Sequence, residues 1–379
     1  MGWTMEHGAD VEPNGARVKC VVRADRRFDC LRAIASSVSR TRGNWPRAKG
    51  LLEMRSEAMS ISSTESDDRA LRRYRAFTLG YVLYGLAVMA WGTYVRATGS
   101  GAGCGAHWPL CNGEVVPRSP ALETLVELTH RVTSGLAWLL APLSWFWARR
   151  LFPPGHPARR FAGWTWILMT TESLLGAGLV LLEMTGRNES VARAAWTGGH
   201  LIHTFLLLGV MVATWHAARP GAAYRWRGHG ALGLALGLAA GAVSLVAMGG
   251  AVAALGDTLF PAESLRHGLQ QDFSPTAHLF LRLRVLHPTL AIWSSLLVGA
   301  ACWLAFRRPG LRRAAVGLAV LQTLQIDVGV ANLLLLAPVW MQVLHLMVAD
   351  LLWIALVWLG LTMAASGAME GAVPRSAAP

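Results

Sequence analysis

Long runs of apolar residues recur along the chain, and short polar stretches rich in arginine separate them. Eight such runs lie at about residues 76–95, 122–147, 161–182, 195–217, 231–254, 284–306, 314–336 and 342–363. A helix rises about 1.5 Å per residue, so each run is long enough to cross a hydrocarbon core of ~30 Å. The pattern therefore predicts an all-α integral membrane protein with eight transmembrane helices.

Arginine clusters alternate with the apolar runs and predict the orientation. They precede the first run and follow the second, fourth and sixth, at Arg69–Arg75, Arg149–Arg160, Arg219–Arg227 and Arg307–Arg313. Positive charge accumulates on cytoplasmic loops, so both termini are predicted to be cytoplasmic in a multi-pass protein of the cell inner membrane. The net charge of +13 is then mostly a topology signal, and we do not interpret it as a sign of nucleic-acid binding.

Residues 1–70 differ from the rest of the chain. They are polar and rich in arginine, and they contain both lysines, Lys19 and Lys49. A secretory signal would need an apolar stretch that is missing here, and the interspersed acidic residues argue against a mitochondrial transit peptide. We expect a disordered or wrongly assigned extension, with Met54 or Met59 as the true start.

The eight predicted helices divide into two similar halves, at residues 71–217 and 231–365. A cytoplasmic linker at 218–230 joins the halves, and residues 366–379 form a cytoplasmic tail. The segment Glu172–Leu182 resembles Gln325–Leu335, with Gly176 matching Gly329. Because each half has an even number of crossings, the repeats run parallel. The sequence thus predicts two pseudo-symmetric four-helix bundles.

Four histidines lie at similar depth, within about the first three turns of the second, fourth, sixth and eighth runs from the outer side. They are His130, His200, His287 and His345. A single intramembrane histidine is often a hydrogen-bonded core residue, but four in matched positions indicate a functional site. Bis-histidine ligation of haem iron takes one imidazole from each of two facing helices, so the pairs are His130 with His200 and His287 with His345. Zinc is less well matched, because His200 and His203 form an isolated pair.

The outer loop after the first helix carries two cysteines, Cys104 and Cys111, which face an oxidising compartment. A disulfide between them is sterically easy, and it is either structural or redox-active. Glu127 lies three residues before His130 and so on the same helical face. It either stabilises the nearby helix N-terminus or serves as an acid, base or proton relay beside the haem. The second half lacks this carboxylate.

The chain resembles the haem A synthase (CtaA-type) family of membrane enzymes over about residues 76–363. The segments that carry the resemblance are TGSGAGCGAHWPLCNG, ELTHR, GGHLIHTFLLL, ALGDTLFPA, RVLHP, LLLLAPVW and QVLHLMVADLLW. The resemblance implies that His130 and His200 hold the substrate haem and that His287 and His345 ligate a haem b. It also implies that Glu127 is the essential acid and that Cys104 and Cys111 form the outer-loop disulfide.

The activity implied by the resemblance is oxidation of the C8 methyl group of haem O to a formyl group, giving haem A for a terminal oxidase. The implied partner is the haem O synthase, and the sequence leaves the electron donor open; a homo-oligomer is compatible with it. A b-type cytochrome or a haem carrier would use the same histidines without needing Glu127. A thiol oxidoreductase would need a second outer cysteine pair, and a prenyltransferase would need aspartate-rich motifs that the sequence lacks.

Two carboxylates depart from the family pattern, Glu172 in the third helix and Asp327 in the seventh. Either marks a proton path or, more simply, a side chain hydrogen-bonded within the bundle, for example to an arginine or a haem propionate. Asp350, His203 and Cys302 are expected to be structural, and His107 and His278 are expected in solvated loops.

Overall fold

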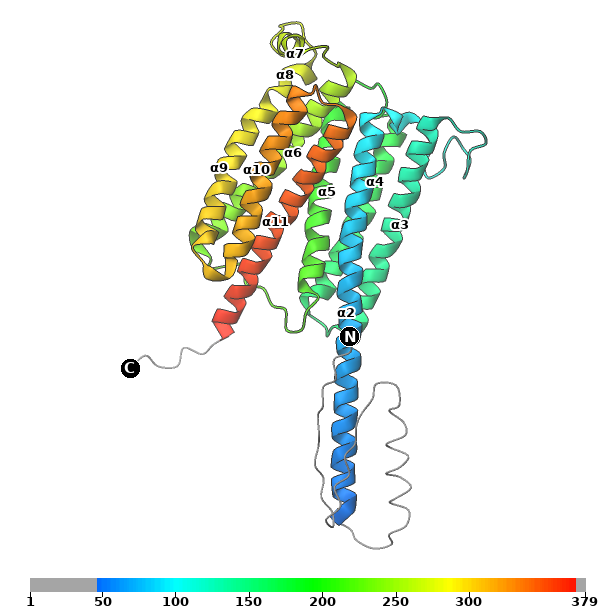
Figure 1. Ribbon diagram of the computed structural model, residues 1–379. Helices are drawn as coiled ribbons and strands as arrows, with labels where there is room; N and C mark the ends of the chain where they lie inside the picture. The colour runs from blue at the N-terminus through cyan, green and yellow to red at the C-terminus, as the bar shows by residue number, and fades with distance from the viewer. Residues whose placement is uncertain (1–45, 373–379) are drawn as a thin grey trace, which may run out of the picture. The chain divides into compact units, whose positions relative to one another are not determined.

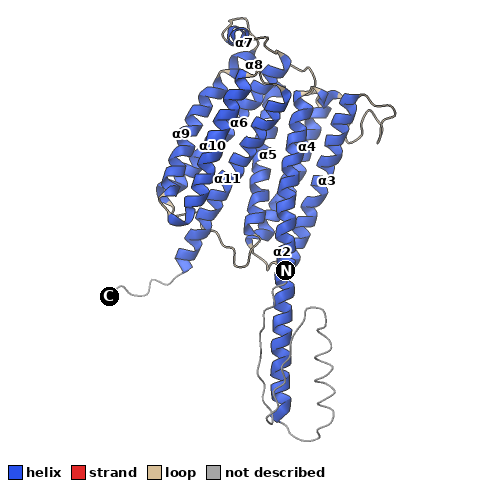
Figure 2. Cartoon of the chain, viewed as in Figure 1, coloured by secondary structure: helices blue, strands red, loops and turns tan. Residues whose placement is uncertain are grey.

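A computed structural model describes residues 46–372, with side chains described over 68–367. The chain divides into two units, residues 1–66 and 67–379, and the candidate membrane spans of the described residues lie in the second unit. Within the described residues the secondary structure is helical, with no named strand (Figure 2). Most of the N-terminal extension, residues 1–45, lies outside the described range. Residues 46–70 belong to the first long helix.

Each predicted apolar run coincides with a long helix. The long helices are α2 (Pro46–Ala97), α3 (Leu122–Leu151), α4 (Pro157–Leu181), α5 (Val191–Ala217), α6 (Gly230–Leu259), α9 (Leu286–Phe306), α10 (Arg312–Leu334) and α11 (Val339–Ala372). The shorter elements are η1 (Ser100–Ala102), α7 (Leu265–Asp272), α8 (Leu279–Arg284) and η2 (Pro309–Leu311). The sixth predicted run differs slightly, because Val285 separates α8 from α9 there.

Seven helices among the described residues are long and apolar enough to cross a membrane. They are α4, α5, α6, α10, the membrane parts of α2 and α11, and the stretch from α8 through α9. The exception among the long helices is α3, whose outer third carries Glu127, His130 and Arg131. Large apolar side chains point outward from the helices, as Ile292, which is 64% exposed, illustrates. Outward apolar surface of this kind is what a lipid-facing helix needs.

Consecutive helices pack side by side within each half of the unit (Figure 1). In the first half, the hydroxyls of Tyr81 and Tyr84 on α2 donate to backbone carbonyls of α3, at Ala137 (2.7 Å) and Thr133 (2.9 Å). In the second half, α6 packs on α9, α9 on α10 and α10 on α11. The histidine-bearing helices therefore have fixed neighbours.

The two halves meet through α5, α6 and α11. The buried indole of Trp353 on α11 donates to the carbonyl of Phe205 on α5 (2.6 Å), and the two rings stack with centroids 5.1 Å apart. Nearer the outer end, Arg96 of α2 donates to the Ala254 carbonyl on α6 (3.2 Å) and to the side-chain oxygen of Gln342 on α11 (2.9 Å). These contacts hold the halves together at two depths.

Candidate functional site

The two histidines of the first half each lie beside a glycine of the preceding helix. A β-carbon placed on Gly92 of α2 would stand 2.9 Å from Cε1 of His130 on α3. A β-carbon placed on Gly176 of α4 would stand 4.0 Å from Cε1 of His200 on α5. The Nδ1 atoms of both histidines are buried and have no hydrogen-bond partner among the described residues. Two half-buried imidazoles are thus left with an Nδ1 atom that no described residue engages.

The second half repeats this arrangement. A β-carbon on Gly250 of α6 would stand 2.9 Å from Cε1 of His287 on α9, and one on Gly329 of α10 would stand 3.0 Å from Cε1 of His345 on α11. The sequence match of Gly176 with Gly329 corresponds to a shared position in the structure. Each of the two glycines lies beside the histidine of the next long helix. Small residues let helix backbones approach closely in membranes, and these glycines make room for an imidazole.

The spacing of His287 and His345 fits a single metal ion between them. Their ring centroids are 6.2 Å apart and the ring planes are nearly perpendicular, at 88°. An imidazole nitrogen binds a metal at about 2 Å, and the ring centroid lies roughly 1 Å beyond that nitrogen. Two imidazoles on opposite sides of one ion would therefore have centroids about 6 Å apart. The residues present fit bis-histidine ligation of a haem iron.

In the first half, His130 and His200 are carried by α3 and α5, which both pack against α4. Sequence reasoning identified the four histidines and one glycine match, but it missed Gly92 and Gly250. A glycine at the same depth in every helix that precedes a histidine helix was the signal that would have found them.

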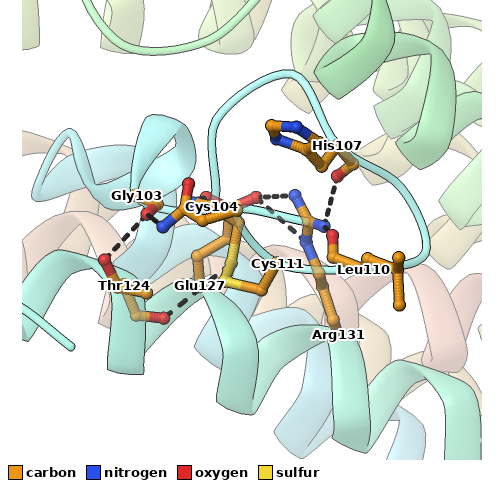
Figure 3. A network of polar contacts seen from close by, with 9 residues as sticks. Gly103, Cys104, His107, Leu110, Cys111, Thr124, Glu127 and Arg131 are labelled. Atoms are coloured by element: carbon orange, nitrogen blue, oxygen red, sulfur yellow. Dashed lines mark hydrogen bonds and ion pairs between the residues drawn. A yellow bond between two sulfur atoms is a disulfide. The ribbon is translucent and has the colours of Figure 1, made fainter. Parts of the chain in front are cut away.

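Glu127 is buried and connects α3 to the outer loop (Figure 3). Its Oε2 accepts the backbone N–H of Cys104 (2.8 Å), and its Oε1 accepts from the guanidinium of Arg131 one turn later, with Nε at 3.1 Å. Nη1 of Arg131 also donates to the loop carbonyls of His107 and Leu110, each at 2.6 Å. Sequence reasoning gave Arg131 no role, although its position four residues after Glu127 is the spacing of a helical ion pair.

The predicted disulfide joins Cys104 and Cys111, and both residues are fully buried. The hydroxyl of Thr124 in the first turn of α3 donates to the Gly103 carbonyl (2.7 Å). At Gly103 a β-carbon would stand 2.5 Å from the backbone of Glu123, so only glycine allows this close approach. The loop is thereby held against the start of α3, next to the carboxylate of Glu127.

Glu172 of α4 forms a second buried polar cluster with α5. Its Oε2 is 2.6 Å from Nδ1 of His203, and its Oε1 accepts from the hydroxyl of Thr204. The same Oε1 lies 3.6 Å from Nδ1 of His200. Nε2 of His203 lies 2.8 Å from the Thr171 hydroxyl. Glu172 is therefore hydrogen-bonded within the bundle, as the simpler interpretation expected, although its partners are a histidine and a threonine instead of an arginine.

The remaining polar residues are placed as follows. Asp350 on α11 is 1% exposed, and neither carboxylate oxygen has a hydrogen-bond partner in the described part of the chain. Asp327 on α10 is exposed. His107 lies exposed in the outer loop, His278 caps the N-terminus of α8, and Cys302 is buried in α9. His107 and Cys302 fit the roles that the sequence predicts, whereas His278 is half-buried beside the rings of Phe260 and Phe280 and does not lie in a solvated loop.

A bundle of long apolar helices, four of which carry a histidine beside a glycine of the preceding long helix, defines a helical protein of the membrane type. The family model described as COX15-CtaA, cytochrome oxidase assembly protein, matches residues 75–357, and the chain belongs to this family. The resemblance found in the sequence motifs is confirmed. The matched range includes all four histidines, both outer cysteines and Glu127.

Curated relatives match the chain over different lengths. Proteins named "Protoheme IX farnesyltransferase" from two strains of Thermus thermophilus are 48% identical over 302 residues, which is 79% of this chain and 50% of theirs. The chain thus spans about half the length of these relatives. A protein named "Heme A synthase" from Alkalihalophilus pseudofirmus is 43% identical over 96 residues, 25% of this chain and 32% of that protein. One of the same name from Exiguobacterium is 37% identical over 111 residues, 29% of this chain and 37% of its own.

Proposed function

We propose that the protein is a haem A synthase, which oxidises the C8 methyl group of haem O to a formyl group by successive hydroxylations. The observation that carries the proposal is the spacing of His287 and His345, 6.2 Å between ring centroids, within a chain of this family. Histidines set against glycines in both halves give a place for two haems. The reaction is inferred from the relatives that are named "Heme A synthase".

The four histidines and Glu127 divide the work between the halves. In the proposal, His130 and His200 bind the substrate haem, and His287 and His345 bind a haem b. Haem b, when bound, supplies electron transfer to the first half. Glu127 has no carboxylate counterpart in the second half, because Arg284 lies three residues before His287. Its side chain is held between Cys104 and Arg131, where it can accept or return a proton at the outer-loop edge of the site.

The proposed topology has eight crossings with both termini cytoplasmic. The seven apolar helices support it directly, and α3 joins them because it lies between α2 and α4 and packs against both. The arginine clusters lie at the same end of the helices as the loops between α3 and α4 and between α9 and α10. Opposite them is the outer loop with Cys104 and Cys111, in agreement with export of that loop across the cell inner membrane.

A haem O synthase is the proposed partner. The Thermus relatives named for farnesyl transfer to protohaem share only half their length with this chain. We assign the farnesyl transfer named in those proteins to the half of their length that has no match in this chain. Two activities joined in one polypeptide would pass haem O from one to the other.

Haem extraction and chromatography test the function. Cells that accumulate haem O would express this protein or its Glu127→Gln variant, with the exposed Glu123→Gln as a matched control from the same helix end. We expect haem A, or its hydroxylated precursor, with the native protein and with Glu123→Gln, and a loss of both with Glu127→Gln. Haem O alone in every culture, with haem b bound to the purified protein, would instead favour the cytochrome or carrier function.

A further inference from the structure

The two halves differ in the surroundings of their second histidine. In the first half, Glu172 lies one helical turn before Gly176, the glycine beside His200. In the second half, Gln325 lies one turn before Gly329, the glycine beside His345. Side chains one turn apart share a helix face, so both Glu172 and Gln325 project toward the imidazole of the neighbouring helix.

Contacts confirm this placement. Oε1 of Glu172 lies 3.6 Å from Nδ1 of His200. The amide nitrogen of Gln325 lies 3.4 Å from both ring nitrogens of His345. The amide oxygen of Gln325 is buried without a hydrogen-bond partner in the described range. Each of these histidines is therefore accompanied by a different group, a carboxylate acceptor in the first half and an amide nitrogen, which is a donor, in the second.

The residues that hold the carboxylate are also specific to the first half. His203 and Thr204 lie three and four residues after His200, and both bind Glu172. The positions three and four residues after His345 are Val348 and Ala349, which offer no polar group on their side chains. Three matching positions thus differ between the halves. The first half has a carboxylate with two polar partners, and the second half has an amide with two apolar neighbours.

A histidine that binds a metal through one ring nitrogen generally donates the N–H of the other to a carboxylate, carbonyl or water, which orients the ring and makes it a stronger ligand. Nδ1 of His200 is buried and lacks such a partner among the described residues. A small rotation of the imidazole would bring Nδ1 within hydrogen-bond distance of Glu172. His203 and Thr204 would keep the carboxylate in place during that rotation.

We propose that Glu172 is a positioning residue for His200, and that it accepts the Nδ1 hydrogen when Nε2 binds the substrate haem iron. The inference rests on the proposed haem sites and deepens them. The carboxylate stabilises the oxidised iron more than an amide would, so Glu172 lowers the reduction potential of the first-half haem relative to the same site with an amide in its place. The pair Glu172 and Gln325 then distinguishes the substrate site from the electron-transfer site.

A redox titration of the purified, haem-loaded protein, followed by its absorption spectrum, tests this. Loss of one transition in His200→Ala and of the other in His345→Ala assigns each midpoint to a half. Glu172→Gln should raise the midpoint of the first half by about 59 mV, which corresponds to about a tenfold change in the ratio of the two oxidation states, and should weaken haem retention there about tenfold. Gln325→Glu is the matched variant and should lower the midpoint of the second half.

Unchanged midpoints in both variants would overturn the inference, as would equal shifts of both haems in either variant. If Glu172→Gln retains no haem, Gln325→Glu carries the test alone, and an unshifted second midpoint then rejects the idea. Loss of turnover in Glu172→Gln with unaltered midpoints and haem content would also reject it and would assign Glu172 to proton transfer. The titration does not depend on turnover. If the protein makes no haem A but shows the expected midpoint shifts, the proposed function is rejected and the inference about Glu172 is supported.

Discussion

Gly250 of α6 lies directly against His287 of α9, so close that a β-carbon there would stand 2.9 Å from the imidazole Cε1. Gly250→Ala should push the imidazole out of its position and lower the amount of haem bound by the second half about tenfold or more. Gly241→Ala on the same helix is the control, since no described atom lies within 4 Å of the added carbon. Both variants are compared by the haem-to-protein ratio of the purified protein. Equal ratios in Gly250→Ala and Gly241→Ala would contradict the close approach of Gly250 to His287.

Arg131 is the cation that accompanies the buried Glu127. Replacing it by glutamine leaves a carboxylate that is 4% exposed without its ion-pair partner. Breaking a buried pair from one side typically costs about 3–5 kcal/mol, and the loop carbonyls of His107 and Leu110 lose their donor as well. We expect a large drop in thermal stability in detergent and faster proteolysis of the outer loop.

The exposed Arg118 of the same loop is the control for Arg131, and its glutamine variant should melt like the native protein. An Arg131→Gln protein with a native melting temperature would mean that Glu127 is held by the Cys104 N–H alone.

Trp353→Phe keeps an aromatic ring to stack on Phe205 and removes the hydrogen bond to its carbonyl. Because this bond is buried between the halves, the loss should be about 1 kcal/mol of unfolding free energy. Trp293→Phe, on a side chain that is 64% exposed, should change stability much less. Denaturation in mixed detergent micelles compares the two. Equal losses of unfolding free energy in the two variants would show that the indole N–H does not stabilise the contact between α5 and α11.

His156 gives the N-terminal end of α4 a pH dependence. Its Nδ1 accepts the N–H of Ala158 (3.2 Å), its ring stacks on Phe152, and burial lowers its pKa from the ordinary value. The folded chain therefore prefers neutral His156, and the stability that this provides is present above about pH 6.5 and is lost as the pH falls. His156→Asn caps without titrating, so its melting temperature should fall less between about pH 7.5 and 5.5. Parallel falls would contradict the prediction.

The sequence predicted the helices well because an uninterrupted apolar run has few alternatives in a membrane. It did not predict the separate helix α8, because the charged residues Arg282 and Arg284 placed the start of the sixth apolar run at residue 284. The histidines were identifiable because a buried imidazole is costly, whereas Gly92 and Gly250 were lost among 39 glycines that membrane helices accept readily. The partners of Glu127 and Glu172 depend on tertiary contacts with the loop and with α5, which no local pattern contains.

Arg96 has a consequence for the symmetry of the molecule. It follows Gly92 by four residues, just as Ala254 follows Gly250, so the two occupy matching places in the halves, and Arg96 donates to the carbonyl of Ala254. In the proposed pair of repeats, a residue that touches its own counterpart lies next to the axis that relates them. Two identical halves would bring two guanidiniums together there, or none. A single guanidinium, with no like charge in the matching place, is therefore available only to unlike halves, and one chain that carries both halves always brings the two together.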